Sequence, residues 1–245
     1  MSFEKTSDLS DRGAGRTVPT LEAVLFDFNG TLFRDAAFHD RAWALMGERH
    51  GRTLHPGDLE RHIIGFTNRE ILDFLFQSSL TDAEVSLLSD EKETIYRDLC
   101  RGAPDVCNLA PGAEAFLDFL KARGIPRTVV TAAIASNVRF FFETFGLDRW
   151  FRFEDTVLDD ERIQGKPFPD MYLEAARRIG VPMDRCMVIE DSRGGLTAAI
   201  RAGAGHVTAV SSDLENAAFI GLSGIDAVVR DFSEIDRTLF RSAPA

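Results

Sequence analysis

VLFDFNGTLF, residues 24–33, decides how the rest of the chain is interpreted. The stretch begins as an apolar run that ends near Asp27, and a turn containing Gly30 follows directly. Such a run, bounded by a turn, predicts a buried β-strand that presents Asp27 at its carboxyl end. Two residues beyond Asp27, within the same turn, stands the amide side chain of Asn29. The stretch therefore predicts a polar site at the edge of a sheet.

Further apolar runs alternate with segments of helical periodicity along the chain. The runs expected as strands are RTVVTA (127–132), RCMVIED (185–191), HVTAV (206–210) and DAVVR (226–230). This alternation indicates right-handed βαβ units, because parallel strands need helical crossovers. We therefore predict an α/β fold, a doubly wound parallel sheet with helices on both faces.

The stretch from residue 35 to residue 105 differs, because it shows helical periodicity and no convincing strand. Thr67 with Glu70, and Thr81 with Glu84, each fit a capping box at a helix start. A helical block inserted after the first strand predicts a cap over the edge of the sheet. We expect a flexible N-terminal tail over 1–19, an α/β core over 20–34 and 106–245, and a helical cap over 35–105.

Charge and cysteine content limit the possible partners and compartments. The 245 residues carry a formal net charge of -11, which argues against a nucleic-acid partner. Cys100, Cys107 and Cys186 form no CxxC pair, so free thiols in a reducing compartment are expected. No apolar stretch reaches the roughly 20 residues of a membrane span. We expect a cytoplasmic protein without a membrane partner.

Polar side chains fall at the carboxyl ends of three of the expected strands. They are Asp27, Thr131, and Glu190 followed by Asp191. Ligands in open parallel sheets bind beyond the carboxyl ends of the strands. The coincidence of several such residues predicts one binding site beneath the cap.

Four motifs occur in an order that resembles the haloacid dehalogenase (HAD) superfamily. They are DFNGTL (27–32), Thr131 in VVTAA, Lys166 in GKPFPD, and Glu190 with Asp191 in IEDSRGG. FHDRAW (38–43) and IIGFTNREIL (63–72) resemble the hinge and cap loop of the branch that contains β-phosphoglucomutase and sugar phosphatases. The resemblance implies a HAD-type phosphatase that acts on a small phosphorylated metabolite, expected to be a sugar phosphate.

The resemblance also implies a role for each matched residue. Asp27 would attack phosphorus and become an aspartyl-phosphate, Lys166 would balance charge and bind phosphate, and Thr131 would donate its hydroxyl to a phosphate oxygen. Mg²⁺ is the implied cofactor, with ligands expected from Asp27, Glu190, Asp191 and the backbone carbonyl of Asn29. The other expected substrate contacts are Gly30, Thr31, Ala132, Asn68 and Arg69.

Asn29 departs from the family pattern, in which an aspartate protonates the leaving group and later deprotonates the attacking water. An amide can do neither, and positioned acid–base catalysis is typically worth ~10²–10⁴ in rate. Three interpretations stay open: an enzyme suited to good leaving groups or helped by a cap base, a phospho-metabolite-binding protein, and an engineered substitution that traps a complex. Phosphosugar mutase activity is a further alternative. The protein is expected to be a monomer or homodimer.

Cap side chains are candidates for the missing acid or base. They are His39, Glu48, His50 and His62. Phosphonate hydrolases, which also lack the second aspartate, need a cap lysine instead. The lysine available here is Lys92, flanked by two glutamates on a helix that we expect to face solvent, which disfavours that chemistry.

Overall fold

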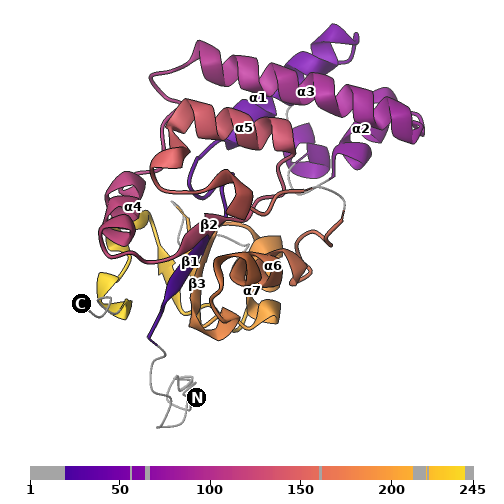
Figure 1. Ribbon diagram of the computed structural model, residues 1–245. Coiled ribbons are helices and arrows are strands. Elements are labelled where there is room, and N and C mark those ends of the chain that lie inside the picture. Colours follow the sequence, from indigo (N-terminus) through magenta and orange to yellow (C-terminus); the bar gives the residue numbers. More distant parts are fainter. Residues whose placement is uncertain are drawn as a thin grey trace, which may run out of the picture.

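The computed structural model describes residues 20–55, 57–63, 67–159, 162–211, 219 and 221–240. The tail expected over 1–19 lies outside the described residues. The sheet and the helices that flank it form the lower part of the molecule in Figure 1, and a further group of helices lies above one edge of the sheet. Helices follow each of the first three strands along the chain, as the sequence predicts.

Five parallel strands form the sheet, in the order β2-β1-β3-β4-β5. Each overlaps a run that the sequence marks as a strand. Their bounds are Ala23–Phe26 (β1), Arg127–Val129 (β2), Cys186–Glu190 (β3), His206–Val210 (β4) and Ala227–Val229 (β5). The predicted α/β parallel sheet is therefore confirmed.

The two faces of the sheet pack into two separate hydrophobic clusters. Val24 and Phe26 of β1 belong to the cluster that includes α4 (Ala113–Ala122) and α5 (Ala135–Phe145). Ala23 and Leu25 belong to the other, with α6 (Asp170–Ile179) and α7 (Arg193–Ala202). Successive side chains of a strand point to opposite faces, so a strand buried on both faces is apolar throughout.

The remaining helices, α1 (Ala36–Arg49), α2 (Asn68–Phe76) and α3 (Asp82–Gly102), form the group at the top of Figure 1. Both predicted capping boxes are present at the starts of α2 and α3. Helix α3 begins at Asp82, directly after Thr81 of the second capping box.

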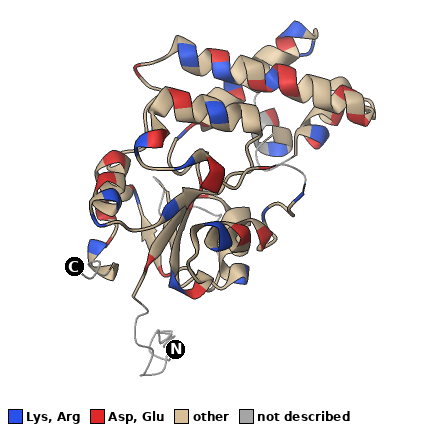
Figure 2. Cartoon of the chain, in the orientation of Figure 1, with Lys and Arg blue, Asp and Glu red and all other residues tan. Residues whose placement is uncertain are grey.

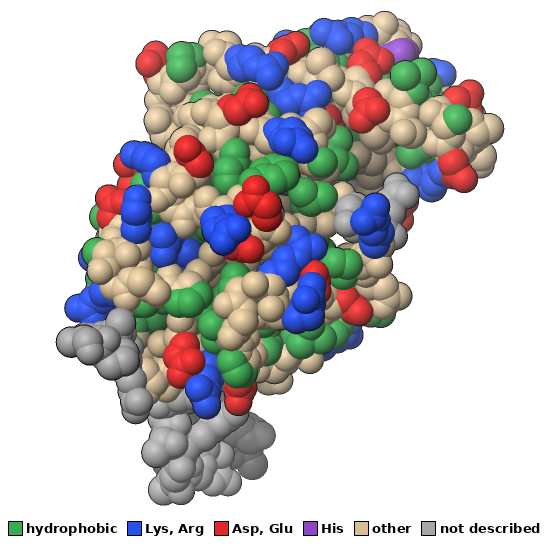
Figure 3. All heavy atoms as spheres, in the orientation of Figure 1, with side chains coloured by type: hydrophobic (Ala, Val, Ile, Leu, Met, Phe, Trp, Pro, Cys, Tyr) green, Lys and Arg blue, Asp and Glu red, His purple; other side chains and the backbone are tan. Residues whose placement is uncertain are grey.

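Short helical turns complete the chain. They are η1 (Leu59–Ile63), η2 (Leu147–Arg149), η3 (Phe153–Asp155), η4 (Met183–Arg185), η6 (Phe232–Glu234) and η7 (Arg237–Leu239). The cap helices carry both acidic and basic residues (Figure 2), and both kinds are interspersed on the face shown in Figure 3. Within the described part of the chain, no helix combines the length and the apolar character that crossing a membrane requires.

Candidate active site

A cavity of about 660 Å³ lies between the carboxyl ends of the strands and the cap helices. Asp27, Thr131 and Asp191 follow β1, β2 and β3 and line its floor, and Lys166 joins them from the segment before α6. The cap contributes walls from α1, α2 and α3. Residues from three strands thus meet at one place, as the positions of their strand ends predict.

Lys166 links two carboxylates at the floor of the cavity. Its Nζ lies 2.6 Å from Oδ1 of Asp27, 2.6 Å from Oε1 of Glu190 and 3.0 Å from the carbonyl oxygen of Val130. Burial alone would lower the pKa of Lys166, but the charges of Asp27 and Glu190 raise it above its ordinary value. Lys166 is therefore a permanent cation held in place by three acceptors.

The second carboxylate oxygen of Asp27, Oδ2, differs from the first. Oδ2 is buried and has no hydrogen bond to any described residue. Burial, together with the charges of Glu190 and Asp191, raises the pKa of Asp27 well above its ordinary value, although Lys166 acts in the opposite direction. A buried carboxylate oxygen of this kind is costly unless a ligand completes it.

Glu190 differs from Asp27, because both of its oxygens are fully used. Lys166 and the hydroxyl of Tyr172 donate to Oε1 at 2.6 and 3.0 Å. The backbone N–H groups of Asp191 and Ser192 and the Ser192 hydroxyl donate to Oε2, each at 3.0 Å. Gly195 lies so close that an added Cβ would meet Oε1 at 1.6 Å. The surroundings of Glu190 hold its carboxylate rigidly in one position.

Asp191 packs against the turn that follows β1. Thr31 donates its hydroxyl to Oδ1 of Asp191 at 3.1 Å. A Cβ on Gly30, whose φ is +84°, would lie 2.0 Å from Oδ2 of Asp191, so only glycine fits there. Burial and the charge of Glu190 raise the pKa of Asp191 to about 7. Gly30 and Thr31 thus position Asp191 and do not line the cavity themselves.

These residues have the composition of a site for a hard divalent cation. Carboxylate oxygens of Asp27, Glu190 and Asp191 lie within 4.8 Å of one another. The uncompleted oxygen of Asp27 can accept a further ligand, and a cation beside Asp191 would favour its ionised form against the effects of burial and of Glu190. Carboxylates with nearby carbonyls are the ligands that Mg²⁺ takes. The residues fit the ion that the sequence motifs imply.

Asn29 is held by hydrogen bonds on both sides of its amide. Thr131 donates its hydroxyl to Oδ1 of Asn29 at 3.1 Å, and Nδ2 donates to Oδ2 of Asp35 at 2.6 Å. Burial would raise the pKa of Asp35, but hydrogen bonds from His39, Tyr96 and Asn29 lower it. Asp35 is therefore an ionised carboxylate behind the amide.

Lys92 does not face solvent, so that prediction is wrong. Its side chain is 3% exposed and lines the cavity. Nζ lies 2.7 Å from Nδ1 of His39 and 2.8 Å from Oε1 of Glu93, with the ring of Trp43 5.0 Å away. The helical phase explains the error, because Lys92 stands three and four residues before the buried Ile95 and Tyr96. An ammonium that donates to both neighbours has no lone pair with which to form a Schiff base.

Of the four candidates for a cap acid or base, the structure brings His39 to the cavity. Glu48 pairs with Arg41, and His50 lies 3.0 Å from Glu91. His62 stacks on Phe74, with ring centroids 4.0 Å apart. None of these three is among the described residues that line the cavity.

Some of the expected substrate contacts line the cavity, and others do not. Asn68, at the start of α2, lines the cavity, as does Ala132 after β2. Arg69 does not line it, because its guanidinium donates to the carbonyl of Leu80 at 3.0 Å and pairs with Asp82 at the start of α3. The role expected for Arg69 in substrate binding is therefore not supported by its position.

Comparison with known proteins identifies a family that the sequence matches. The sequence model of the haloacid dehalogenase-like hydrolases matches residues 21–203. The chain belongs to this HAD-like hydrolase family. The match spans the sheet core up to α7 together with the inserted cap helices, and it confirms the resemblance that the four motifs indicate.

Relatives within the HAD-like family include sugar-phosphate enzymes. A phosphorylated carbohydrates phosphatase of Thermotoga maritima is 26% identical, over 86% of this chain and 94% of the relative. A β-phosphoglucomutase of Mycobacterium bovis is 28% identical, over 88% and 91%. The crystal structure of a HAD hydrolase, family IA, variant 3, from Entamoeba histolytica superposes with a TM-score of 0.83 at 30% identity, covering 89% of this chain and 97% of that one.

Several residues of this HAD-like site were not predicted from the sequence. They are Asp35, Trp43, Glu93, Tyr96 and Asn137. Asn137 donates to Oε2 of Glu93 at 2.6 Å, which joins α5 of the core to α3 of the cap. The spacing of Asp35 and His39, four residues apart, is a signal that could have indicated their contact, since such residues share a helix face.

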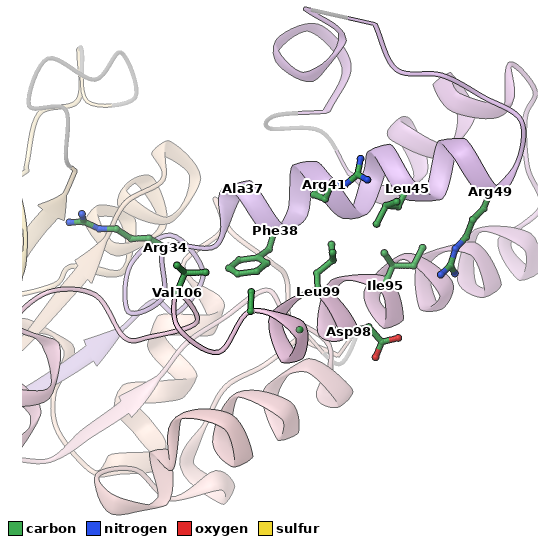
Figure 4. Close-up of a pocket in the computed structure, with 12 residues that line it drawn as sticks. Arg34, Ala37, Phe38, Arg41, Leu45, Arg49, Ile95, Asp98, Leu99 and Val106 are labelled. Carbon is green, nitrogen blue, oxygen red and sulfur yellow. The ribbon is translucent and has the colours of Figure 1, made fainter.

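A second cavity, of about 700 Å³, lies between α1 and α3 of the HAD-like chain. Phe38, Leu99 and Val106 meet in it, and Arg41 and Arg49 lie along α1 (Figure 4). None of Asp27, Glu190 and Asp191 is among the described residues that line this second cavity. The first cavity is therefore the candidate active site.

Proposed function

We propose that the protein is a Mg²⁺-dependent phosphatase of a small phosphorylated metabolite, in the class of sugar phosphates that its relatives' names indicate. The observation that carries the proposal is the buried Oδ2 of Asp27, which has no hydrogen-bond partner among the described residues, in a residue that lines the cavity with Lys166 and Asp191. Buried carboxylate oxygens in an enzyme site are completed by a cation or a substrate.

Asp27 would act as the nucleophile. One carboxylate oxygen attacks phosphorus, a bond from Asp27 to phosphorus forms, and the bond to the leaving oxygen breaks with its electron pair. Water then cleaves the aspartyl-phosphate and releases inorganic phosphate. Lys166 and the hydroxyl of Thr131 would hold the phosphoryl oxygens while charge spreads over them.

The metal ligands follow from which carboxylates are already satisfied. Asp27 and Asp191 would hold Mg²⁺ directly, with the backbone carbonyl of Asn29. Glu190 already accepts five hydrogen bonds from its surroundings. It would therefore support the metal site indirectly, because it holds Lys166 and the turn at Asp191 in position. The bound ion would supply positive charge to the phosphoryl group, as hard cations do in phosphoryl transfer.

Asn29 limits what this site does well. Its amide neither donates a proton to the leaving group nor accepts one from water. Transfer from an acyl or aryl phosphate needs little protonation, whereas transfer from a sugar alcohol needs much. We therefore expect good leaving groups to react faster. A phosphosugar mutase is less well supported, because it must return the phosphoryl group to a second hydroxyl.

A catalytically weak binder of a phosphorylated metabolite is the second candidate. The observation that favours it is the engagement of both polar atoms of the Asn29 side chain in hydrogen bonds, which leaves the amide no part in proton transfer. The cytoplasmic location and the monomeric or dimeric state stay predictions under either function.

Phosphate release from a panel of compounds separates the two candidates. The panel contains sugar phosphates, acetyl phosphate and an aryl phosphate, each with Mg²⁺ and with EDTA. Multiple turnover that EDTA removes supports the phosphatase. Saturable binding of a phosphate ester without turnover of any compound supports the binder.

A further inference from the structure

The carboxylate of Asp35 accepts hydrogen bonds from the side chain of Asn29 and from the backbone of the next residue, Gly30. Nδ2 of Asn29 donates to Oδ2 of Asp35 at 2.6 Å, and the backbone N–H of Gly30 donates to Oδ1 at 3.1 Å. On the far side of the amide, Thr131 donates to Oδ1 of Asn29. The contact with Asp35 assigns the amide orientation, because a carboxylate can only accept and the atom of Asn29 that faces it must therefore be the donor Nδ2.

The other neighbours of Asp35 are donors as well. The hydroxyl of Tyr96, in α3, donates to Oδ2 at 2.7 Å, and Nε2 of His39, in α1, lies 3.2 Å from it. Lys92 has only donors to offer to Nδ1 of His39, so Nε2 carries the hydrogen that points to Asp35. Asp35 is 2% exposed and thus cannot turn to water.

A carboxylate at position 29 would not fit this arrangement. It would replace the donor 2.6 Å from the buried carboxylate of Asp35 with a second acceptor. The hydrogen bond would be lost, and two like charges would lie in contact at low dielectric. Asp35 itself is not among the described residues that line the cavity, so it does not touch a substrate directly.

We propose that Asp35 is a positioning residue matched to Asn29, and that the pair commits the site to phosphates whose leaving group departs without a proton. This inference rests on the proposed phosphatase function. The carboxylate stands six residues further along the chain, where it orients the amide and not the substrate. The surroundings of position 29 therefore suit an amide. Asn29 is not a single substitution in a site that is otherwise built for a second aspartate. Acyl phosphates are the chemical class that such a site serves.

A double-mutant cycle tests the match without reference to activity. Thermal unfolding in EDTA is measured for the unaltered protein, Asn29→Asp, Asp35→Asn and the double variant. We expect Asn29→Asp to lower Tm by about 4–8 °C, and the double variant to recover at least about half of that loss, because donor and acceptor have exchanged places. A double variant whose loss equals the sum of the single losses would overturn the match.

Asn108→Asp provides the matched control for an added carboxylate. Asn108 is exposed and donates to the backbone carbonyl of Asp105, not to a carboxylate. We expect this variant to change Tm by no more than about 2 °C. A loss as large as that of Asn29→Asp would show that the added charge alone destabilises the protein, and would contradict the specific pairing.

Activity tests the commitment to a leaving group. The readout is the rate with a sugar phosphate divided by the rate with acetyl phosphate, in the same four proteins. We expect the ratio to rise by about 10² or more in the double variant and by less in Asn29→Asp. An equal rise in the single variant, or none in the double, would overturn the proposal. If no protein hydrolyses either compound, the phosphatase function fails, while the unfolding cycle still decides the match.

Discussion

Nζ of Lys166 lies 2.6 Å from Oδ1 of Asp27 and equally far from Oε1 of Glu190, so one ammonium serves two buried carboxylates. A cation at this position offsets the repulsion between the carboxylates and places a fixed positive charge beside Asp27.

Replacement of Lys166 by methionine is therefore expected to lower the rate of phosphate release at least about 100-fold, because the transferring group loses a fixed positive charge. The rate at saturating acetyl phosphate, with Mg²⁺ present, measures the effect. Lys121→Met, on the exposed face of α4, is the matched control. A Lys166 variant within about threefold of the unaltered protein would show that the charge plays no part in turnover.

Magnesium binding is expected to weaken as pH falls below about 7. The pKa of Asp191 is raised to about 7, so below that value a proton competes with the metal for the carboxylate. Without metal, the raised pKa contributes stability that is present below the ordinary value of about 4 and is lost as pH rises through about 7. Binding of Mg²⁺ should restore the folding stability that is lost at the higher pH.

Thermal unfolding with Mg²⁺ and with EDTA, at about pH 6 and about pH 8, measures this linkage. We expect a larger Mg²⁺-induced rise in Tm at the higher pH. Asp191→Asn should remove most of the rise at both. Equal rises at the two pH values in the unaltered protein would argue against Asp191 as a ligand.

Lys92 and Arg69 are expected to differ in their effect on substrate use, although both are cap cations. Lys92→Met should lower kcat/KM by about 10–100-fold, since it removes a buried cation that faces the cavity and donates to His39. Arg69→Met should leave kcat/KM within about twofold, because its guanidinium binds Leu80 and Asp82. Steady-state kinetics on one substrate compare the pair. The reverse order of effects would place the substrate elsewhere in the cap.

The strands and the floor of the site were predictable because they follow from local rules. Val24 to Phe26 is an apolar run with a polar residue at its end, and that pattern alone places Asp27 at the carboxyl edge. The capping boxes at Thr67 and Thr81 are equally local, and both are present. The sheet then brings the strand ends together without further information.

The cap contacts were not predictable in the same way, because they depend on how α1 and α3 pack. Lys92 lies between two glutamates, so its neighbours in sequence suggest solvent, whereas its helix face carries Ile95 and Tyr96 into the core. Asp35 gives no local sign that Asn29 will lie against it. Its role depends on Tyr96, which is 61 residues away in sequence. Periodicity measured from the capping box would have placed Lys92 on the buried face.

The central claim is that Asp27 takes the phosphoryl group from the substrate. The most direct measurement is phosphate release from acetyl phosphate with Mg²⁺, by the unaltered protein and by Asp27→Asn, which keeps the shape of the side chain. We predict turnover by the unaltered protein, its loss in EDTA, and a fall of at least about 10³-fold in the variant. Turnover by Asp27→Asn equal to that of the unaltered protein would contradict the account.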